Sequence, residues 1–140
     1  MLDIVHEDIQ TIVRGIQKDS KKFAGKTVLV TGGAGFLGTF FVGVFDALNK
    51  KILSKPCKVI VLDNFITGRE KNVLGLTFGK HISLVQHDVR TPFIPKGSVD
   101  YIIHAAGIAS PVFYMAHPFE TIEVATKGLQ NMLELARKKK

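Results

Sequence analysis

A glycine-rich stretch directly after an apolar run constrains this chain more than any other feature of its sequence. Residues 28–38 read VLVTGGAGFLG. Gly33, Gly35 and Gly38 satisfy the pattern G-x-G-x-x-G, and Gly32, Gly35 and Gly38 satisfy G-x-x-G-x-x-G. This spacing permits a tight turn, a close approach of the backbone to a ligand, and close packing of a helix on a strand.

The residues on either side of the glycines predict a strand that turns into a helix. Residues 27–31 (TVLVT) form a β-branched run typical of a buried strand. After the glycines, apolar residues recur at helical spacing: Phe36, Leu37, Phe40, Phe41, Val44, Phe45 and Leu48. The free N–H groups and positive dipole end of a helix beginning near Gly35 favour a bound pyrophosphate. We expect that a side chain larger than hydrogen at Gly32 or Gly35 would occupy the space of this ligand.

An acidic residue at the end of the next predicted strand completes the pattern. Residues 58–65 (KVIVLDNF) predict that strand, and Asp63 follows Gly38 by about 25 residues, near the offset expected for a dinucleotide site. A carboxylate there accepts hydrogen bonds from the adenosine ribose and repels a 2′-phosphate, so NAD is favoured over NADP. The alternative is a flexible turn without a ligand. The strand, the helix and Asp63 together favour the dinucleotide.

The rest of the chain predicts a continued alternation of strands and helices. We expect an amphipathic helix over residues 2–19, strands over 81–89 and 98–107, and a helix over 117–140. The apolar stripe expected on the last helix consists of Ile122, Leu129, Met132, Leu133 and Ala136. Such alternation predicts an α/β fold, a partial Rossmann fold with a parallel sheet in the strand order 3-2-1-4 and flanking helices. We expect its strands to be buried on both faces.

Charge and cysteine content exclude several classes of protein. The 140 residues carry a formal net charge of +7, much of it in lysines before the first strand and at the end of the chain. These basic residues are not interleaved with aromatic ones, so an anionic small ligand is favoured over nucleic acid. Cys57 is the only cysteine, which excludes an internal disulfide and favours a cytoplasmic location. No metal site, membrane span or signal peptide is expected.

Several stretches resemble the extended short-chain dehydrogenase/reductases that act on sugar nucleotides. They run in the same order from residue 26 onward: VTGGAGFLG, VLDNFITGREKNV, HDVRTPF, DYIIHAAGIASP, YMAHPFETI and GLQNMLELA. Among these epimerases, dehydratases and decarboxylases, the chain is most similar to the UDP-glucuronate decarboxylases. The resemblance implies a tightly held NAD that transiently oxidises a nucleotide-sugar at C4, and a homo-oligomer.

The resemblance also implies which residues hold NAD. Besides Gly32, they are Gly35, Phe36 and Leu37 along the pyrophosphate; Asp63, Asn64, Phe65, Thr67 and Gly68 around the adenosine ribose and its phosphate; Asp88 and Val89 beside adenine; and Ala105, Ala106 and Gly107 as a floor of small residues beneath the cofactor. Simpler interpretations remain open for some of them. Asp88 could cap a turn, Phe65 could belong to the core, and the small residues could form a tight strand end. His104 is interpreted as a structural histidine.

The sequence departs from the resembling enzymes in two places. Where the decarboxylases carry a Lys-Thr-Asn run, this chain has Glu123, Val124 and Ala125. A glutamate there is expected to repel an acidic sugar, which puts UDP-glucuronate in doubt as the substrate. The second departure is the catalytic Tyr-x-x-x-Lys segment, because Tyr101 and Tyr114 are followed four residues later by Ala105 and Pro118.

These departures predict the N-terminal part of an enzyme, with no catalytic residue among the 140. We expect residues 1–25 to form an N-terminal helix with its connection, and residues 26–140 to form an incomplete NAD-binding domain. The expected function is to bind NAD within a nucleotide-sugar-modifying enzyme that resembles UDP-glucuronate decarboxylase. The alternatives are a non-catalytic nucleotide-binding module, or part of a sugar-nucleotide 4-epimerase or 4,6-dehydratase.

Overall fold

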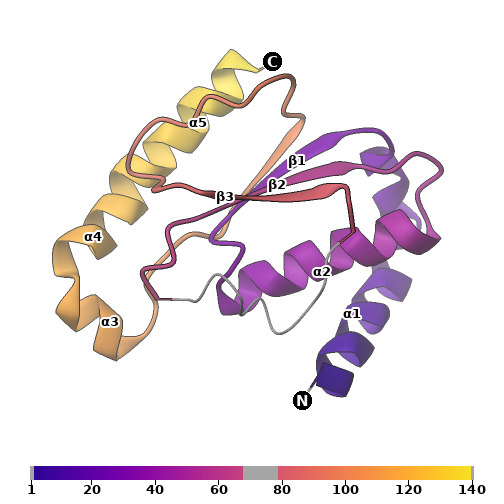
Figure 1. Ribbon diagram of the computed structural model, residues 1–140, viewed down its shortest axis with the longest axis horizontal. Coiled ribbons are helices and arrows are strands. Elements are labelled where there is room, and N and C mark those ends of the chain that lie inside the picture. Colours follow the sequence, from indigo (N-terminus) through magenta and orange to yellow (C-terminus); the bar gives the residue numbers. More distant parts are fainter. Residues whose placement is uncertain (1, 68–78, 140) are drawn as a thin grey trace.

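A parallel sheet between two layers of helices organises the chain (Figure 1). The computed structural model describes residues 2–67 and 79–139. Its elements are α1 (Leu2–Ile16), the 3₁₀ helix η1 (Asp19–Phe23), β1 (Thr27–Thr31), α2 (Phe36–Lys51), β2 (Lys58–Asp63), β3 (Ile82–Gln86), β4 (Tyr101–His104), α3 (Pro111–Ala116), α4 (Pro118–Glu123), the π-helix η2 (Val124–Gly128) and α5 (Leu129–Lys138). The strands are parallel in the order β3-β2-β1-β4, which confirms the predicted fold.

Side chains of the central strands alternate between two hydrophobic clusters, one on each face of the sheet. Val30 and Val59 belong to the cluster shared with α1 and α2. Leu29 and Leu62 belong to the cluster shared with α5, which also contains Met132. This alternation follows from the period of two residues in a strand. The sheet is therefore covered by α2, with α1 packed on it, on one side and by α5 on the other (Figure 1).

The expectation that all strands are buried on both faces is wrong for the outer two. All five residues of β1 are buried, whereas Ser83, Leu84 and Gln86 of β3 are exposed. Every residue of β4 is half-buried. The physical reason is position, because β3 and β4 form the edges of the described sheet and each pairs with one neighbour there. An apolar strand sequence does not by itself distinguish a central strand from an edge strand.

The helices also differ from their predicted bounds and faces. The first ends at Ile16 and is followed by η1, and α3 was not predicted. On α2, Phe36 and Leu37 are exposed, whereas Thr39 and Val42 are buried. The first helical turn extends beyond the sheet and reaches the end where the strands finish. The described helices include none that is long and apolar enough to cross a membrane.

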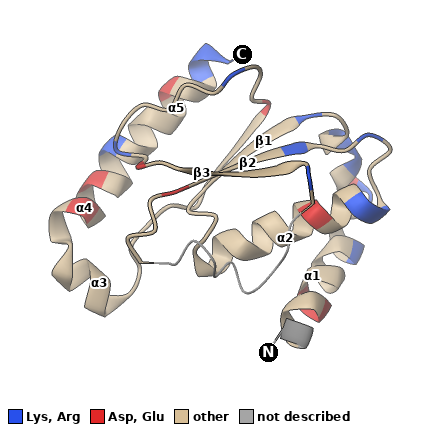
Figure 2. Cartoon of the chain, viewed as in Figure 1, with Lys and Arg blue, Asp and Glu red and all other residues tan. Residues whose placement is uncertain are grey.

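Helix α1 packs on α2 and joins the same core cluster as the sheet. Val5, Ile9 and Val13 are buried there. The division of the chain at residue 25 stays a prediction. Helix α1 shares its hydrophobic core with the rest of the described chain. Figure 2 shows basic residues at the starts of β1, β2 and β3 and at the end of α2. Much of the positive charge therefore lies at the end of the sheet where the strands begin.

Candidate functional site

The glycine turn is held by backbone contacts that leave no room for a side chain at its first position. Gly32 has φ +67°, and its N–H donates to the Leu62 carbonyl at 2.7 Å. A Cβ atom on Gly32 would lie 2.7 Å from the backbone of Ala105 and Ala106. The expected reason for glycine at position 32, namely that a side chain would occupy ligand space, is therefore wrong. It would first meet the protein's own backbone.

Two further glycines bring α2 close to the turn in different ways. A Cβ atom on Gly38 would overlap the Gly32 carbonyl, so glycine is needed there for the helix to pack on the turn. Gly35 has an extended backbone, and a Cβ atom there would meet only the Gly32 carbonyl oxygen, at 3.2 Å. The surroundings of Gly35 are otherwise open, and Gly35 lines the pocket described below. The prediction that a side chain at Gly35 would occupy ligand space fits this geometry.

The start of α2 presents unpaired N–H groups toward the same side. The first N–H groups of a helix have no partner within the helix. Here Thr39 is the first residue of α2 whose N–H bonds back, to the Gly35 carbonyl at 3.0 Å, and its hydroxyl donates to the same carbonyl at 2.7 Å. The backbone donors of Phe36, Leu37 and Gly38 precede it. Oriented donors at the positive end of a helix dipole favour an anionic group.

Asp63 joins the glycine turn to the end of β2. One carboxylate oxygen accepts the Ala34 N–H at 2.9 Å, and the other accepts the Phe65 N–H at 2.8 Å. Phe65 has φ +59°, so the chain turns sharply directly after the strand. A carboxylate has about four acceptor positions, so each oxygen keeps one for a ligand after these two bonds. The side chain is half-buried at the rim of the pocket.

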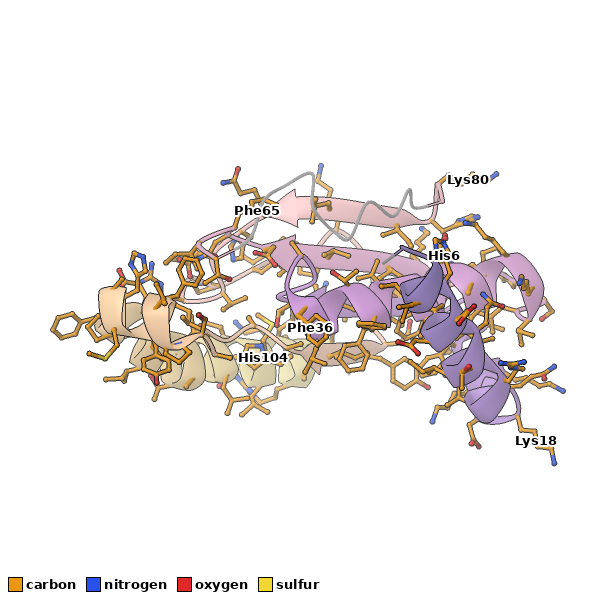
Figure 3. All side chains as sticks on the ribbon, turned by 90° about the horizontal axis from the view of Figure 1, so that it is seen from below. His6, Lys18, Phe36, Phe65, Lys80 and His104 are labelled. Carbon is orange, nitrogen blue, oxygen red and sulfur yellow. The ribbon has the colours of Figure 1, made fainter. Side chains whose placement is uncertain are left out.

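A pocket of about 420 Å³ opens where β1, β2 and β4 end, and most of the predicted NAD residues line it. These are Gly32, Gly35, Phe36, Leu37, Asp63, Asn64, Thr67, Val89, Ala105, Ala106 and Gly107. Phe65 and Asp88 do not line it, and Gly68 lies outside the described residues. Figure 3 shows Phe36, Phe65 and His104 away from the end of the molecule that carries Lys18 and Lys80. The pocket therefore lies apart from that basic end, and the net charge does not by itself indicate an anion in this pocket.

Other lining residues were missed by the sequence analysis. They are Ile66, His87, Ile108, Ala109, Ser110, Phe113, Glu120 and Val124, together with Gly38 and Leu62. Phe113 lies on α3, an element that was not predicted. Ser110 immediately precedes that helix, and the Ser-Pro pair at 110–111 was an available signal for a helix start. The unpredicted helix α3 therefore accounts for part of the pocket lining that the sequence did not predict.

Thr31 and His104 connect the glycine turn to the floor of small residues. The Thr31 hydroxyl oxygen lies 2.7 Å from Nδ1 of His104 and accepts the Ala106 N–H at 3.2 Å. Burial lowers the pKa of His104, so the neutral imidazole is favoured at neutral pH. These contacts fit the interpretation of His104 as a structural histidine. In the described residues, no group of three or more His, Cys, Asp or Glu side chains could hold a metal ion.

Asp88 has partners other than a ligand. Arg90 donates to both of its carboxylate oxygens at 2.8–3.0 Å, and the Arg90 backbone N–H donates to one of them at 2.9 Å. The Arg90 guanidinium lowers the pKa of Asp88 to about 2. Asp88 therefore caps the turn after β3, which is the simpler of the two interpretations considered for it. A contact of its carboxylate with adenine stays a prediction.

Glu123 is neutralised rather than directed toward the pocket. Its carboxylate pairs with Arg90 at 3.1 Å and with Lys127 at 2.6 Å, and these contacts lower the pKa of Glu123. The next residue, Val124, is buried and lines the pocket instead. Two cations therefore accompany the Glu123 carboxylate in this structure. Its repulsion of an acidic sugar stays a prediction.

The family model of the NAD dependent epimerase/dehydratase family matches residues 28–140. The chain belongs to this family. It is 40% identical over 111 residues to UDP-glucuronic acid decarboxylase 1 of Arabidopsis thaliana, an alignment covering 79% of this chain and 23% of that protein. It is also 40% identical over 113 residues to UDP-glucuronic acid decarboxylase 1 of Danio rerio, covering 81% and 25%. The chain thus spans about a quarter of the length of these curated relatives.

Solved structures of two bacterial proteins share the fold. The dTDP-glucose 4,6-dehydratase DesIV of Streptomyces venezuelae, solved with NAD and TYD bound, is 28% identical, with a TM-score of 0.62, covering 79% of this chain and 35% of that one. The Bordetella bronchiseptica enzyme WbmF, solved with NAD⁺, is 21% identical, with a TM-score of 0.63, covering 85% and 34%. The family is NAD-dependent, and both of these structures hold NAD.

The geometry of this chain fits NAD on its own terms. A pyrophosphate needs donors and a backbone that it can approach, and the open side of Gly35 lies beside the unpaired N–H groups of α2. A ribose needs an acceptor, and Asp63 keeps free acceptor positions at the same pocket. The floor at Ala105–Gly107 carries only small side chains.

Proposed function

We propose that residues 26–140 are the NAD-binding part of an enzyme that modifies a sugar nucleotide and resembles UDP-glucuronate decarboxylase. One observation carries the proposal: the glycine turn, the start of α2 and Asp63 meet at a single pocket at the carboxyl ends of the parallel strands. In open α/β sheets, ligands bind at this edge where the strand order reverses. NAD, when bound, supplies a reversible hydride acceptor for the sugar.

In this proposal each group of residues has a distinct task in binding. The N–H groups at the start of α2 hold the pyrophosphate against Gly35. Asp63 accepts hydrogen bonds from the ribose hydroxyls and disfavours a 2′-phosphate. Asn64, Phe65 and Thr67 surround this ribose, Val89 lies toward adenine, and Ala105–Gly107 lie beneath the cofactor. The sugar-nucleotide is the proposed partner of the whole enzyme, and nucleic acid is not.

Calorimetric titration of the 140-residue chain with NAD and with NADP tests the proposal. We expect NAD to bind more tightly, because the Asp63 carboxylate accepts from hydroxyls and repels a phosphate. Asp63→Ala should weaken NAD binding and narrow the preference, and Glu134→Gln, on an exposed stretch of α5, is the control. Equal affinity of the parent chain for both cofactors would contradict the assignment of Asp63.

A second candidate function is that these 140 residues by themselves bind a nucleotide without catalysis, because they contain no Tyr-x-x-x-Lys pattern. General acid–base catalysis contributes roughly 10²- to 10⁴-fold, and neither Tyr101 nor Tyr114 has lysine at the required spacing. We therefore expect the purified 140-residue chain to bind NAD but to convert no nucleotide-sugar. Incubation with NAD and UDP-glucuronate, UDP-glucose or dTDP-glucose, followed by product chromatography, measures this. Formation of UDP-xylose, an epimer or a 4-keto sugar would contradict it and would identify the reaction.

A further inference from the structure

Arg90 forms ion pairs with two residues that each precede a lining residue of the pocket: Asp88 precedes Val89, and Glu123 precedes Val124. Its Nε and one terminal nitrogen donate to the Asp88 carboxylate, and the other terminal nitrogen donates to Glu123 Oε2 at 3.1 Å. The side chains of Arg90, Asp88 and Glu123 are 28%, 25% and 34% exposed. Their charges are therefore less screened by solvent than those of a fully exposed pair. A planar guanidinium can join two carboxylates in this way, which a lysine ammonium does less well.

On one side of Arg90, the contacts continue to the turn that follows β2. Asn64 Nδ2 donates to Asp88 Oδ2 at 3.1 Å, and Asn64 Oδ1 accepts the Ile66 N–H at 3.1 Å. Asn64 and Ile66 both line the pocket, next to Asp63. Arg90 therefore holds the carboxylate that fixes the Asn64 side chain. Through Asn64, this contact reaches the backbone of the turn at the proposed ribose position.

On the other side, the contacts continue to the helices that cover the sheet. Glu123 is the last residue of α4, and the next residue, Val124, lines the pocket. A second bond supports the same junction, because Asn131 Nδ2 of α5 donates to the Val89 carbonyl at 2.8 Å. Gly128 of η2 permits this approach, since a Cβ atom there would lie 3.0 Å from Val89 Cγ2. Val89 is buried and lines the pocket between these contacts.

We infer that Arg90 is a positioning residue for the adenosine half of the proposed NAD site. Through Asp88 it fixes the Asn64 turn, and through Glu123 it holds the α4–η2 helix against the loop that carries Val89. Asp88 then connects Arg90 to the Asn64 side chain within the protein. This inference rests on the proposed function, because it assigns a task within the same pocket.

The test compares NAD binding by the parent chain, Arg90→Met, Arg90→Lys and Glu123→Gln in calorimetric titrations. Arg90→Met removes both ion pairs and should weaken NAD binding about tenfold, whereas Glu123→Gln removes one and should weaken it about threefold. Arg90→Lys should recover part of the loss, because an ammonium keeps the charge without the fork. Arg137→Met is the matched control, since it breaks an exposed pair with Glu134 on α5, away from the pocket lining.

Saturation-transfer NMR on NAD separates positioning from general loss of structure. Arg90→Met should reduce saturation of the adenine protons relative to the nicotinamide protons, whereas partial unfolding would reduce both together. Unchanged NAD affinity in Arg90→Met, or equal loss at both ends of NAD, would overturn the inference. If Arg90→Met does not fold, the same titration and NMR measurement on Glu123→Gln test the inference. Unchanged NAD binding by Glu123→Gln would then overturn the inference. Failure of the parent chain to bind NAD would instead refute the proposed function.

Discussion

At the scale of single residues, the glycines of the chain differ in what they require. Gly32 needs both a positive φ and an empty Cβ position against the Ala105–Ala106 backbone. We expect Gly32→Ala to lower the free energy of unfolding by about 2–4 kcal/mol, from backbone strain and overpacking. Gly15→Ala is the matched control, because a Cβ atom there meets nothing within 4 Å and should stabilise α1 by about 0.5–1 kcal/mol. Urea unfolding of both variants measures the contrast, and similar effects would contradict it.

A substitution at Gly35 should affect NAD binding much more than the stability of the fold. Its backbone is extended, which valine adopts readily, and its Cβ position is close only to the Gly32 carbonyl oxygen. Gly35→Val should therefore lose NAD binding while its thermal unfolding stays close to that of the parent chain. Calorimetric titration and circular dichroism on the same sample test this. Normal NAD binding by the folded variant would mean that the glycine stretch is a turn without a ligand.

The Asp88–Arg90 pair predicts a pH dependence of stability. The guanidinium holds the pKa of Asp88 at about 2, below its ordinary value of 3.8. A carboxyl group with a depressed pKa in the folded state contributes stability above its ordinary pKa and loses it as the pH falls through the folded value. The parent chain should therefore lose stability between about pH 4 and pH 2 more steeply than Asp88→Asn. Urea unfolding at pH 5, 4 and 3 measures the two slopes, with Asp19→Asn at an exposed position of η1 as control. Parallel slopes would contradict the prediction.

At the scale of elements, the last helix illustrates where sequence reasoning succeeds and where it fails. A helix over 117–140 was expected, and α4, η2 and α5 run without interruption from Pro118 to Lys138. The predicted apolar stripe is right at Met132, which is buried, and wrong at Ile122, Leu129 and Leu133, which are exposed, whereas the buried Leu135 was not predicted. The π-helix at Val124–Gly128 has a different period from an α-helix. The buried positions Val124, Gly128, Met132 and Leu135 nevertheless follow one another at intervals of four, four and three residues, so the helix turns an adjacent face toward the core.

This correction predicts unequal effects of two neighbouring substitutions. Met132 is 2% exposed in the cluster with Leu29 and Leu62, whereas Leu133 is 62% exposed. Met132→Ala should lower the free energy of unfolding by about 2–4 kcal/mol through lost burial and a cavity. Leu133→Ala should change it by about 0.5 kcal/mol or less. Urea unfolding compares the two variants. A larger effect of Leu133→Ala would support the buried face that the sequence predicted for this helix.

The strands were better predicted than the site because their signals are local. The run TVLVT and the pattern that ends at Asp63 identify β1, β2 and the turn between β1 and α2 from sequence neighbours alone. Arg90 contacts Asp88, which is two residues before it, but it also contacts Glu123, which lies 33 residues beyond it in the chain. No local pattern brings Arg90 and Glu123 together. The pairing arises only when the loop after β3 and the end of α4 pack on each other.

At the scale of the whole molecule, the exposed surfaces lead to a prediction about self-association. In the described sheet β4 pairs with β1 alone. Leu129 and Leu133 are exposed on α5, which packs beside β4, and Ile122 is exposed on α4. Open strand edges and contiguous apolar surface favour association between copies of a chain. Helix α1 does not cover this side, because it packs on α2 across the sheet.

We therefore expect the 140-residue chain to form dimers or larger species at micromolar concentration. Ile122→Lys combined with Leu133→Lys should shift it toward monomer, since both side chains are more than half exposed and the core should tolerate their replacement. Ile12→Lys on α1 is the control, because that side chain is also exposed but lies on the other side of the sheet. Size-exclusion chromatography with light scattering over a concentration series measures the mass. A monomeric parent chain at every concentration would contradict the prediction, and dimers unaffected by the double substitution would place the interface elsewhere, with the edge of β4 as the remaining surface on this side.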